Sequence, residues 1–123
     1  ALKCADLGHL AEELAVHKRW VGCLEEEFFL QGDREKAAGL PVSPLFDRDK
    51  PGVTKSQVGF FEFVVIPLFN NFSSVFKPAR AMMDAVLHNY THWKAADAQA
   101  KQEATIRAAQ DRMAATGDQG KQT

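Results

Sequence analysis

A carboxylate and two imidazoles near the start of the chain have spacings that suit a metal site. Asp6 and His9 are three residues apart, and Glu13 and His17 follow at steps of four. On a helix such steps place side chains on one face, and carboxylates and imidazoles both bind metal ions. Gly8 interrupts any helix here, so spacing alone leaves a second interpretation open: a surface cap with an exposed or core-satisfied histidine.

A second pair of residues suits the recognition of a flat, polar ring system. Gln57 and Phe60 are three residues apart, so one helical turn presents an amide beside an aromatic ring. An amide donates and accepts at once, which suits the edge of a purine base, and a ring can stack on the face of the base. Two simpler interpretations stay open: Gln57 closes a capping box that begins at Thr54, and Phe60 belongs to the core.

The other titratable residues have ordinary structural interpretations. His88 and His92 are four apart on an expected helix, but no third ligand is evident, so we interpret them as a solvated pair. The glutamates at 25–27 spread around a helix, which is typical of a solvated run. Cys4 and Cys23 lack a metal-type spacing and indicate two reduced, half-buried thiols in a cytosolic protein.

The elements that position these residues are predicted to be helices. Apolar residues recur at steps of three, four and seven over residues 10–38, and His17 lies in the same stripe. An irregular connector at residues 40–53 follows, and its large apolar pair, Leu45 and Phe46, is expected to turn inward.

Helices also fill the second half of the chain. The capping box at residues 54–57 begins one helix, Pro67 predicts a kink or break at the preceding residue, and Pro78 suits the first turn of the next helix. Residues 94–115 favour a solvated helix that ends near Gly117, followed by a disordered tail. No useful strand-like alternation occurs, so the fold class is all-α. The side chains expected to be buried are Val58, Phe61, Val65, Leu68, Phe69, Phe72, Phe76, Met82, Met83, Val86, Leu87, Tyr90 and Trp93.

Composition narrows the class of protein. The net charge of the 123 residues is −1, and the 15 basic residues are scattered, which argues against nucleic-acid binding. Polar residues and Pro67 interrupt the apolar stretch at residues 58–76, which we interpret as a buried helix and not as a transmembrane segment. The chain has no basic-then-apolar leader and opens at Ala1 within an apolar pattern, so we expect a cytoplasmic fragment of a longer protein.

Several motifs together resemble the second half of the class I cyclic-nucleotide phosphodiesterase catalytic domain, an HD-type multi-helix domain. They are Ala5-Asp6-Leu7, Trp20, Glu26-Glu27-Phe28-Phe29, Gln31-Gly32-Asp33, Ser43-Pro44-Leu45, Ser56-Gln57-Val58-Gly59-Phe60, Pro67, and Asn89 with Trp93. The resemblance covers residues 1–93, so we expect the C-terminal part of that domain there and a polar helical extension with a tail at 94–123. His9, His17 and Leu30 are locally similar to the calmodulin-regulated, dual-specificity branch.

The resemblance implies roles that spacing could not establish. Asp6 matches a ligand of the catalytic zinc ion. Gln57 matches the glutamine that hydrogen-bonds the purine, and Phe60 and Leu24 match residues that clamp the base from opposite faces. The remaining substrate-binding positions that the resemblance implies are His9, Leu45 and Ser56.

The resemblance also implies which parts lie outside this chain. The family's H-N-x-x-H and H-D-x-x-H motifs, which supply the general acid and the other metal ligands, are absent, so no catalytic residue is assigned here. The intact enzyme is expected to bind Zn²⁺ with Mg²⁺ or Mn²⁺ and to hydrolyse cyclic AMP, cyclic GMP or both to 5′-nucleotides. Alone, without its upstream part, this chain is expected to be inactive. The alternative is a non-catalytic helical interaction module.

Overall fold

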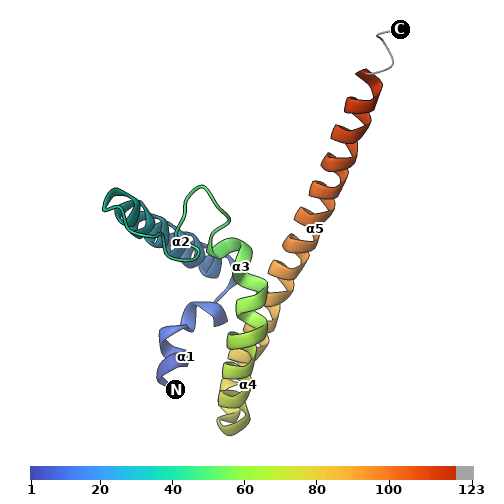
Figure 1. Ribbon diagram of the computed structural model, residues 1–123. Helices are drawn as coiled ribbons and strands as arrows, with labels where there is room; N and C mark the ends of the chain where they lie inside the picture. The colour runs from blue at the N-terminus through green and yellow to red at the C-terminus, as the bar shows by residue number, and fades with distance from the viewer. Residues whose placement is uncertain (119–123) are drawn as a thin grey trace.

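The chain is helical throughout the part that the structure describes. The computed structural model describes residues 1–118, with side chains through residue 115 (Figure 1). No strand occurs among these residues, so the all-α fold class is confirmed. The elements are α1 (Leu2–Asp6), the 3-10 turn η1 (Gly8–Ala11), α2 (Leu14–Ala37), α3 (Val53–Phe60), the π turn η2 (Phe61–Val65), α4 (Ile66–Val75), the 3-10 turn η3 (Lys77–Ala79) and α5 (Arg80–Asp118).

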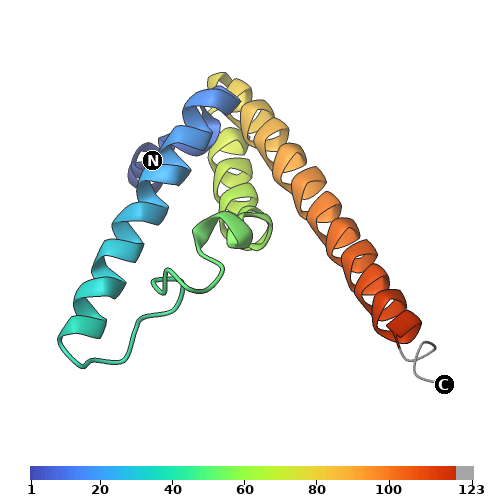
Figure 2. The same ribbon diagram turned by 90° about the horizontal axis from the view of Figure 1, so that it is seen from above.

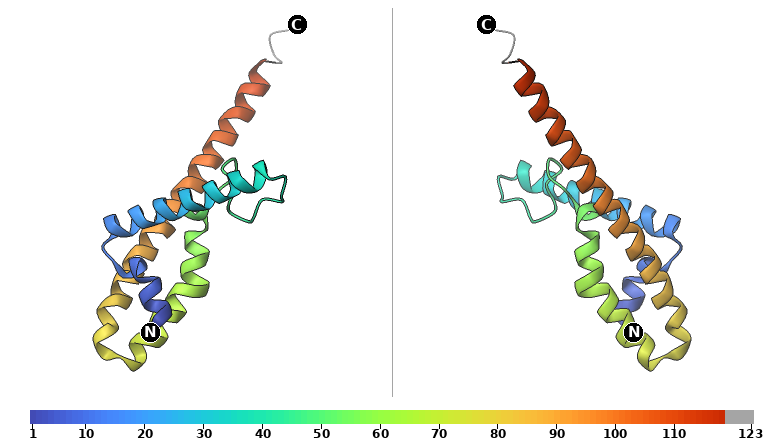
Figure 3. Two further views of the ribbon diagram at one scale, coloured as in Figure 1. Left: turned by 90° about the vertical axis from the view of Figure 1, so that its left-hand side faces the viewer. Right: turned by 90° about the vertical axis from the view of Figure 1, so that its right-hand side faces the viewer.

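Two antiparallel helical arms form the core. The continuous run α3–η2–α4 lies beside the first half of α5, and η3 joins the two arms (Figure 3). Phe61, Val65 and Phe69 from the first arm pack with Met83 and Val86 from the second, and all five are buried as expected. Full burial of one such side chain contributes about 1.5–3 kcal/mol, so this seam holds the arms together.

Two residues expected in the core lie at the surface instead. Phe76 is 53% exposed and Leu87 is 41% exposed, so the prediction that they are buried is wrong. Phe76 follows the end of α4 with an extended backbone and packs its ring on Phe72 at the edge of the turn. Leu87 comes one residue after the buried Val86, which turns it about 100° away from the buried stripe of α5.

Pro67 disturbs its helix without breaking it. The π turn η2 lies directly before α4, in which Pro67 is the second residue. Proline lacks an N–H, and its ring clashes with the carbonyl four residues earlier in a regular helix. A wider turn relieves that conflict, so the expected kink at the residue before Pro67 takes the form of a π turn.

A contact from α5 sets the beginning of α2. The helix predicted from residue 10 begins at Leu14, because the chain is extended at Glu12 after η1. The buried amide of Asn89 donates to the carbonyl oxygens of Leu10 and Glu12, at 3.0 and 2.9 Å. These carbonyls are therefore satisfied from a distant helix instead of from within a longer α2.

The predicted capping box at the start of α3 is wrong. The helix begins at Val53 with Gly52 as its N-cap, so Thr54 is already inside it. The N–H of Thr54 donates to the carboxylate of Glu25 on α2 at 3.0 Å, and the side chain of Gln57 donates to the carbonyl of Val53 at 3.2 Å. A carboxylate from another helix satisfies the N–H that the local pattern had assigned to a cap.

The second half of α5 projects away from the rest of the molecule (Figures 1 and 2). Side chains of residues 98–115 are exposed, as expected for a solvated helix, and Asp97 pairs with Lys101 at 2.6 Å along its surface. The helix reaches Asp118, the last residue of the described part. The disordered tail predicted after Gly117 falls on residues that lie outside it, and the domain boundary after residue 93 stays a prediction.

One helical stretch in the described part of the chain, Val53–Val75, is long and apolar enough to cross a membrane by length and composition alone. An 18-residue part of this stretch has a mean hydropathy of 1.4, and 22% of that part is buried inside the described structure. Core helices of other proteins pass the same test, so the finding is weak evidence for a membrane span. The expectation of a buried helix at residues 58–76 is correct for one face only, because Phe61, Val65, Phe69 and Ser73 are buried whereas Phe63, Val75 and Phe76 are exposed.

A buried histidine joins α2 to α5. His17 is fully buried, and its Nε2 accepts a hydrogen bond of 2.8 Å from the indole N–H of Trp93. The edge of Phe61 also meets its ring, at 5.7 Å between centroids. Burial, with a smaller repulsion from His9, lowers the pKa of His17 to about 4.

Gly32 on α2 is expected to tolerate no side chain. A Cβ there would lie 1.8 Å from the carbonyl oxygen of Phe46, so Gly32→Ala must push two backbones apart. We expect a loss of about 1–3 kcal/mol of stability. Gly22→Ala on the same helix is the matched control, because nothing lies within 4 Å of a Cβ added there. Helix propensity predicts that this variant gains up to about 1 kcal/mol of stability. Thermal unfolding followed by circular dichroism measures both, and equal midpoints for the two variants would contradict the close approach.

The low pKa of His17 predicts an acid-sensitive fold. The unfolded chain binds a proton at His17 below about pH 6.5, whereas the folded chain binds it only near pH 4. The free energy of unfolding should therefore fall between about pH 6.5 and pH 4, by up to about 3 kcal/mol. His17→Gln keeps an acceptor for Trp93 and a donor for His9 but does not titrate, so it should flatten this slope. Denaturant unfolding at a series of pH values is the measurement, and an unchanged slope in the variant would show that other groups cause it.

Candidate functional site

One candidate site is an apolar pocket of about 820 Å³ between η1, α2, the connector and α3. All six residues that the sequence resemblance assigned to substrate binding line it, although they come from four different segments. Figure 2 shows the connector as a loop that runs from the end of α2 to the start of α3. The lining residues are Leu7, His9, Leu24, Phe28, Leu45, Val53, Lys55, Ser56, Gln57, Gly59 and Phe60.

Gln57 is the buried polar group of this pocket. It is 3% exposed, and its Nε2 donates to the carbonyl oxygen of Val53, which also accepts from the hydroxyl of Ser56 at 2.8 Å. Because a carbonyl can only accept, the amide must turn its NH₂ toward Val53 and its Oε1 the other way. That Oε1 is buried and has no hydrogen-bond partner among the described residues. An unpaired buried acceptor costs about 1–3 kcal/mol, which a ligand's donor would recover.

The walls of the pocket are apolar on two sides. Leu24 and Phe28 reach it from α2, and Phe60 reaches it from α3; all three are half-buried. The ring of Phe28 is also stacked on Phe46 of the connector, with centroids 4.4 Å apart. An apolar cavity with a single buried amide suits a flat heterocyclic ligand that needs few, well-placed hydrogen bonds.

Leu45 forms the rim of the pocket in an unusual conformation. Its φ is +71°, a left-handed backbone that costs a non-glycine residue about 1–2 kcal/mol. The expectation that Leu45 and Phe46 both turn inward is therefore correct only in part. Phe46 is half-buried, whereas Leu45 is 42% exposed at the pocket's edge.

The hydrogen bonds around His17 determine which nitrogen of His9 carries a proton. The indole of Trp93 occupies Nε2 of His17, so the proton of a neutral His17 is on Nδ1. That Nδ1 lies 3.1 Å from Nδ1 of His9, which must then accept. His9 therefore carries its proton on Nε2 and offers one N–H donor. Burial lowers the pKa of His9, which keeps the ring neutral near pH 7.

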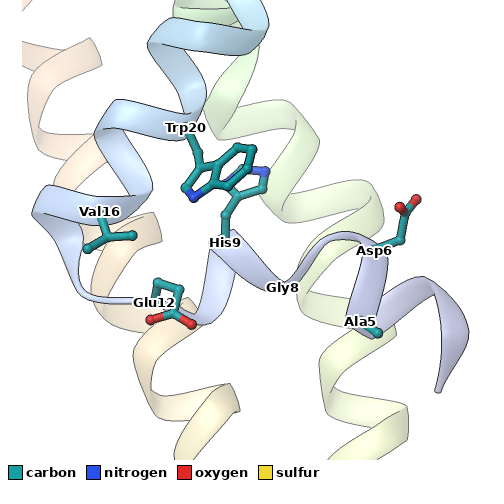
Figure 4. A pocket seen from close by; sticks show the side chains of 7 residues that line it. All are labelled: Ala5, Asp6, Gly8, His9, Glu12, Val16 and Trp20. Atoms are coloured by element: carbon teal, nitrogen blue, oxygen red, sulfur yellow. The ribbon is translucent and has the colours of Figure 1, made fainter.

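Asp6 borders a second, more polar pocket of about 550 Å³ (Figure 4). His9 lines both pockets, so the two adjoin. Asp6 ends α1 and Gly8 begins η1, and this break separates Asp6 from the helix face that it was predicted to share with His9. In Figure 4 the carboxylates of Asp6 and Glu12 lie at opposite ends of the pocket.

The residues present do not form a metal site by themselves. No group of three or more His, Cys, Asp or Glu side chains able to hold a metal ion occurs in the described part of the chain. Glu13 is exposed while His17 is fully buried and bonded to Trp93, so these two do not extend a ligand set from Asp6. The exposed carboxylate of Asp6 can contribute one hard oxygen ligand and needs partners from elsewhere.

Some of the structural interpretations made from the sequence need correction. His88 is exposed, but His92 is half-buried against Trp93, so the two are not simply a solvated pair. Cys4 is buried and Cys23 exposed, although both were expected to be half-buried; both are free thiols.

The acidic run at residues 25–27 is also more than a solvated surface. Glu25 caps α3, and Glu26 binds Arg48 of the connector through two bonds of 2.9 and 3.0 Å. Sequence reasoning missed these contacts and the pocket residue Phe28, although the charges of the connector were visible. The available signal was an acidic face on one helix followed by a connector that carries Arg48 and Lys50 among its charged residues.

The comparisons with known proteins agree with this geometry. Residues 1–86 match the family model of 3′5′-cyclic nucleotide phosphodiesterases. A 3′,5′-cyclic-AMP phosphodiesterase, isoform F, of Drosophila melanogaster is 40% identical over 92 residues, which are 74% of this chain and 14% of that protein. The human high affinity cGMP-specific 3′,5′-cyclic phosphodiesterase 9A is 43% identical over 82 residues, 67% of this chain and 14% of that one.

Two further similarities widen the range of relatives. A bovine dual specificity calcium/calmodulin-dependent 3′,5′-cyclic nucleotide phosphodiesterase 1B is 47% identical over 74 residues, 60% of this chain and 14% of that protein. The solved structure of LmjPDEB1 in complex with IBMX superposes with a TM-score of 0.69 at 30% identity, covering 75% of this chain and 28% of that one. The matched part of the chain thus spans about a seventh of the length of each of these three curated relatives. With the family model matched from α1 to the second turn of α5, this chain belongs to the 3′,5′-cyclic nucleotide phosphodiesterase family.

Proposed function

We propose that the full-length protein hydrolyses 3′,5′-cyclic nucleotides to 5′-nucleotides, and that this chain supplies the pocket for the base. The observation that supports this most strongly is the convergence of His9, Leu24, Leu45, Ser56, Gln57 and Phe60 on one apolar pocket. Gln57 also carries a buried Oε1 that has no hydrogen-bond partner among the described residues.

The chain's residues would bind and orient the base. Gln57 would accept a hydrogen bond from the base edge, and His9 would offer an N–H at the side where the two pockets adjoin. Leu24 and Phe60, from separate helices, would cover the faces of the base, and Leu45 would close its open side. A base held in one orientation fixes where the cyclic phosphate lies, and such positioning is a large part of catalysis. Matching relatives act on cyclic AMP, on cyclic GMP or on both, so we propose no preference.

We further propose that Asp6 is a ligand of a zinc ion in the full-length protein, with Mg²⁺ or Mn²⁺ as the second ion. Bound metal ions of this kind polarise a phosphoryl oxygen and activate water. The pocket bordered by Asp6 adjoins the base pocket through His9, which is where the phosphate of a bound nucleotide would extend. The other ligands and the general acid would come from the rest of the catalytic domain, which would be the immediate partner of this chain. A cytoplasmic location remains part of this proposal.

A second candidate function is a non-catalytic helical interaction module. It is favoured by several large apolar side chains that are exposed in the described structure, among them Leu2 at 85%, Phe63 at 82% and Val75 at 71%. Exposed apolar surface of this extent marks contact with another protein segment. The rest of a catalytic domain would cover the same surface, so the two functions differ in activity and not in the need for a partner.

Two substitutions in the full-length protein separate metal binding from base binding. Asp6→Ala should lower kcat by about 100-fold or more, because loss of an outer partner of a metal ligand already costs about 10–100-fold. It should also reduce the metal content of the purified protein. Gln57→Ala should instead raise KM by about 10-fold through the lost buried hydrogen bond. Steady-state kinetics with both cyclic nucleotides and metal analysis are the measurements. Near-normal turnover and metal content in Asp6→Ala would overturn its assignment as a ligand.

The 123-residue chain alone should not hydrolyse cyclic nucleotides at a rate above background. It provides one carboxylate, that of Asp6, to the proposed metal site, and its described part holds no group of three or more side chains that could bind a metal ion. Release of 5′-nucleotide from purified chain with added Zn²⁺ and Mg²⁺ is the assay, and the full-length protein is the positive control. Metal-dependent turnover by the chain alone would show that the active site is complete without the rest of the domain.

A further inference from the structure

The connector between α2 and α3 holds Leu45 in a conformation that the residue does not favour by itself. A leucine with positive φ, such as Leu45, is maintained only where surrounding contacts constrain its backbone. Residues with such backbones cluster at ligand sites. Leu45 lines the pocket, and the next residue, Phe46, places its carbonyl against Gly32 and its ring on Phe28. The connector is therefore pressed against α2 where it meets the pocket.

Polar anchors hold the connector two residues before and two residues after Leu45. Ser43 donates from its N–H and its hydroxyl to the carboxylate of Glu35, at 2.8 Å each. Asp47 binds the ammonium group of Lys36 at 2.7 Å, and Asp49 binds the same group at 2.9 Å. Glu35 and Lys36 both belong to the last turns of α2, so the two anchors fix both sides of Leu45 to one rigid helix.

Arg48 makes the largest set of contacts between the connector and α2. Its guanidinium donates two bonds to Glu26, at 2.9 and 3.0 Å, and two to Asp33, at 2.9 and 3.2 Å. It also lies over the ring of Phe29, 5.2 Å from the centroid. Single exposed ion pairs contribute little to stability, but bidentate arginine contacts within a network fix geometry. These bonds raise the pKa of Arg48 and lower that of Glu26, so both stay charged at neutral pH.

We propose that Arg48 is a positioning residue for the nucleotide pocket: bound to Glu26 and Asp33, it holds the connector on α2 and so keeps Leu45 at the rim. The inference rests on the proposed function, because it assigns the pocket to the base of a cyclic nucleotide. Arg48 does not line the pocket itself, so its effect on substrate is indirect, and Leu45 is the lining residue of the connector that Arg48 holds on α2.

A double-mutant cycle in the full-length protein tests this route. Arg48→Ala and Leu45→Ala should each raise KM by about five-fold with little change in kcat, because the network holds a pocket wall and not the reacting groups. The double variant should be no worse than either single variant, since residues that act through one another are not additive. Combined with Gln57→Ala, which acts on a separate contact, Arg48→Ala should multiply the rise in KM. Arg48→Lys keeps the positive charge but loses the paired N–H donors of the guanidinium, so its KM should lie between those of wild type and Arg48→Ala.

The matched control is Arg34→Ala, which removes an exposed arginine from α2, the helix that Arg48 binds, and should leave KM unchanged. Suppose that the full-length protein is active and that KM of the Arg48→Ala/Leu45→Ala double variant rises by the product of the two single effects. This result would overturn the positioning role and leave the proposed function intact. If Arg48→Ala instead lowers kcat by the same factor by which it raises KM, and also lowers the melting midpoint, the role of Arg48 is limited to stability. A wild-type full-length protein that neither binds nor hydrolyses cyclic nucleotides would overturn the proposed function, and the positioning role with it.

Discussion

The junction between α5 and the beginning of α2 governs the rest of this structure. Trp93 donates to the buried His17, 76 residues away in the chain, and Asn89 donates to the carbonyls of Leu10 and Glu12. These bonds lie in the interior, where an unmade hydrogen bond is expensive, so they define how the two halves meet. α5 contributes no residue to the lining of the apolar pocket around Gln57, yet its contacts place η1 and α2 opposite α3.

The same junction links packing to the chemistry of the site. Trp93 occupies Nε2 of His17 and therefore sets which ring nitrogen carries the proton in His17 and in His9, although Trp93 lies outside both pockets. Gln57 is oriented in a comparable way by the carbonyl of Val53. Each polar group offered to a ligand therefore has its orientation set by a second group behind it, which is how binding sites avoid reorganising when the ligand arrives.

Much of the site was predictable from the sequence, because its residues occur in short motifs with specific side chains. The motifs around Gln57 and Glu26–Phe29 identified the family, and the resemblance assigned six of the eleven residues that line the pocket. The helical periodicity also placed most of the core correctly, including Phe61, Val65 and Val86. Local patterns failed where a distant group replaced a local one: Glu25 capped α3 instead of Thr54, and Asn89 delayed the start of α2 until Leu14.

The sequence by itself determined the helical class, the family and six of the residues that line the pocket, because helical periodicity and short motifs can be recognised from the order of the side chains alone. Only the tertiary structure decided the left-handed conformation of Leu45, the contacts of Arg48 with Glu26 and Asp33, and the tautomer of His9. Each of these depends on atoms that are brought together from separate helices, and sequence spacing carries no record of such distances.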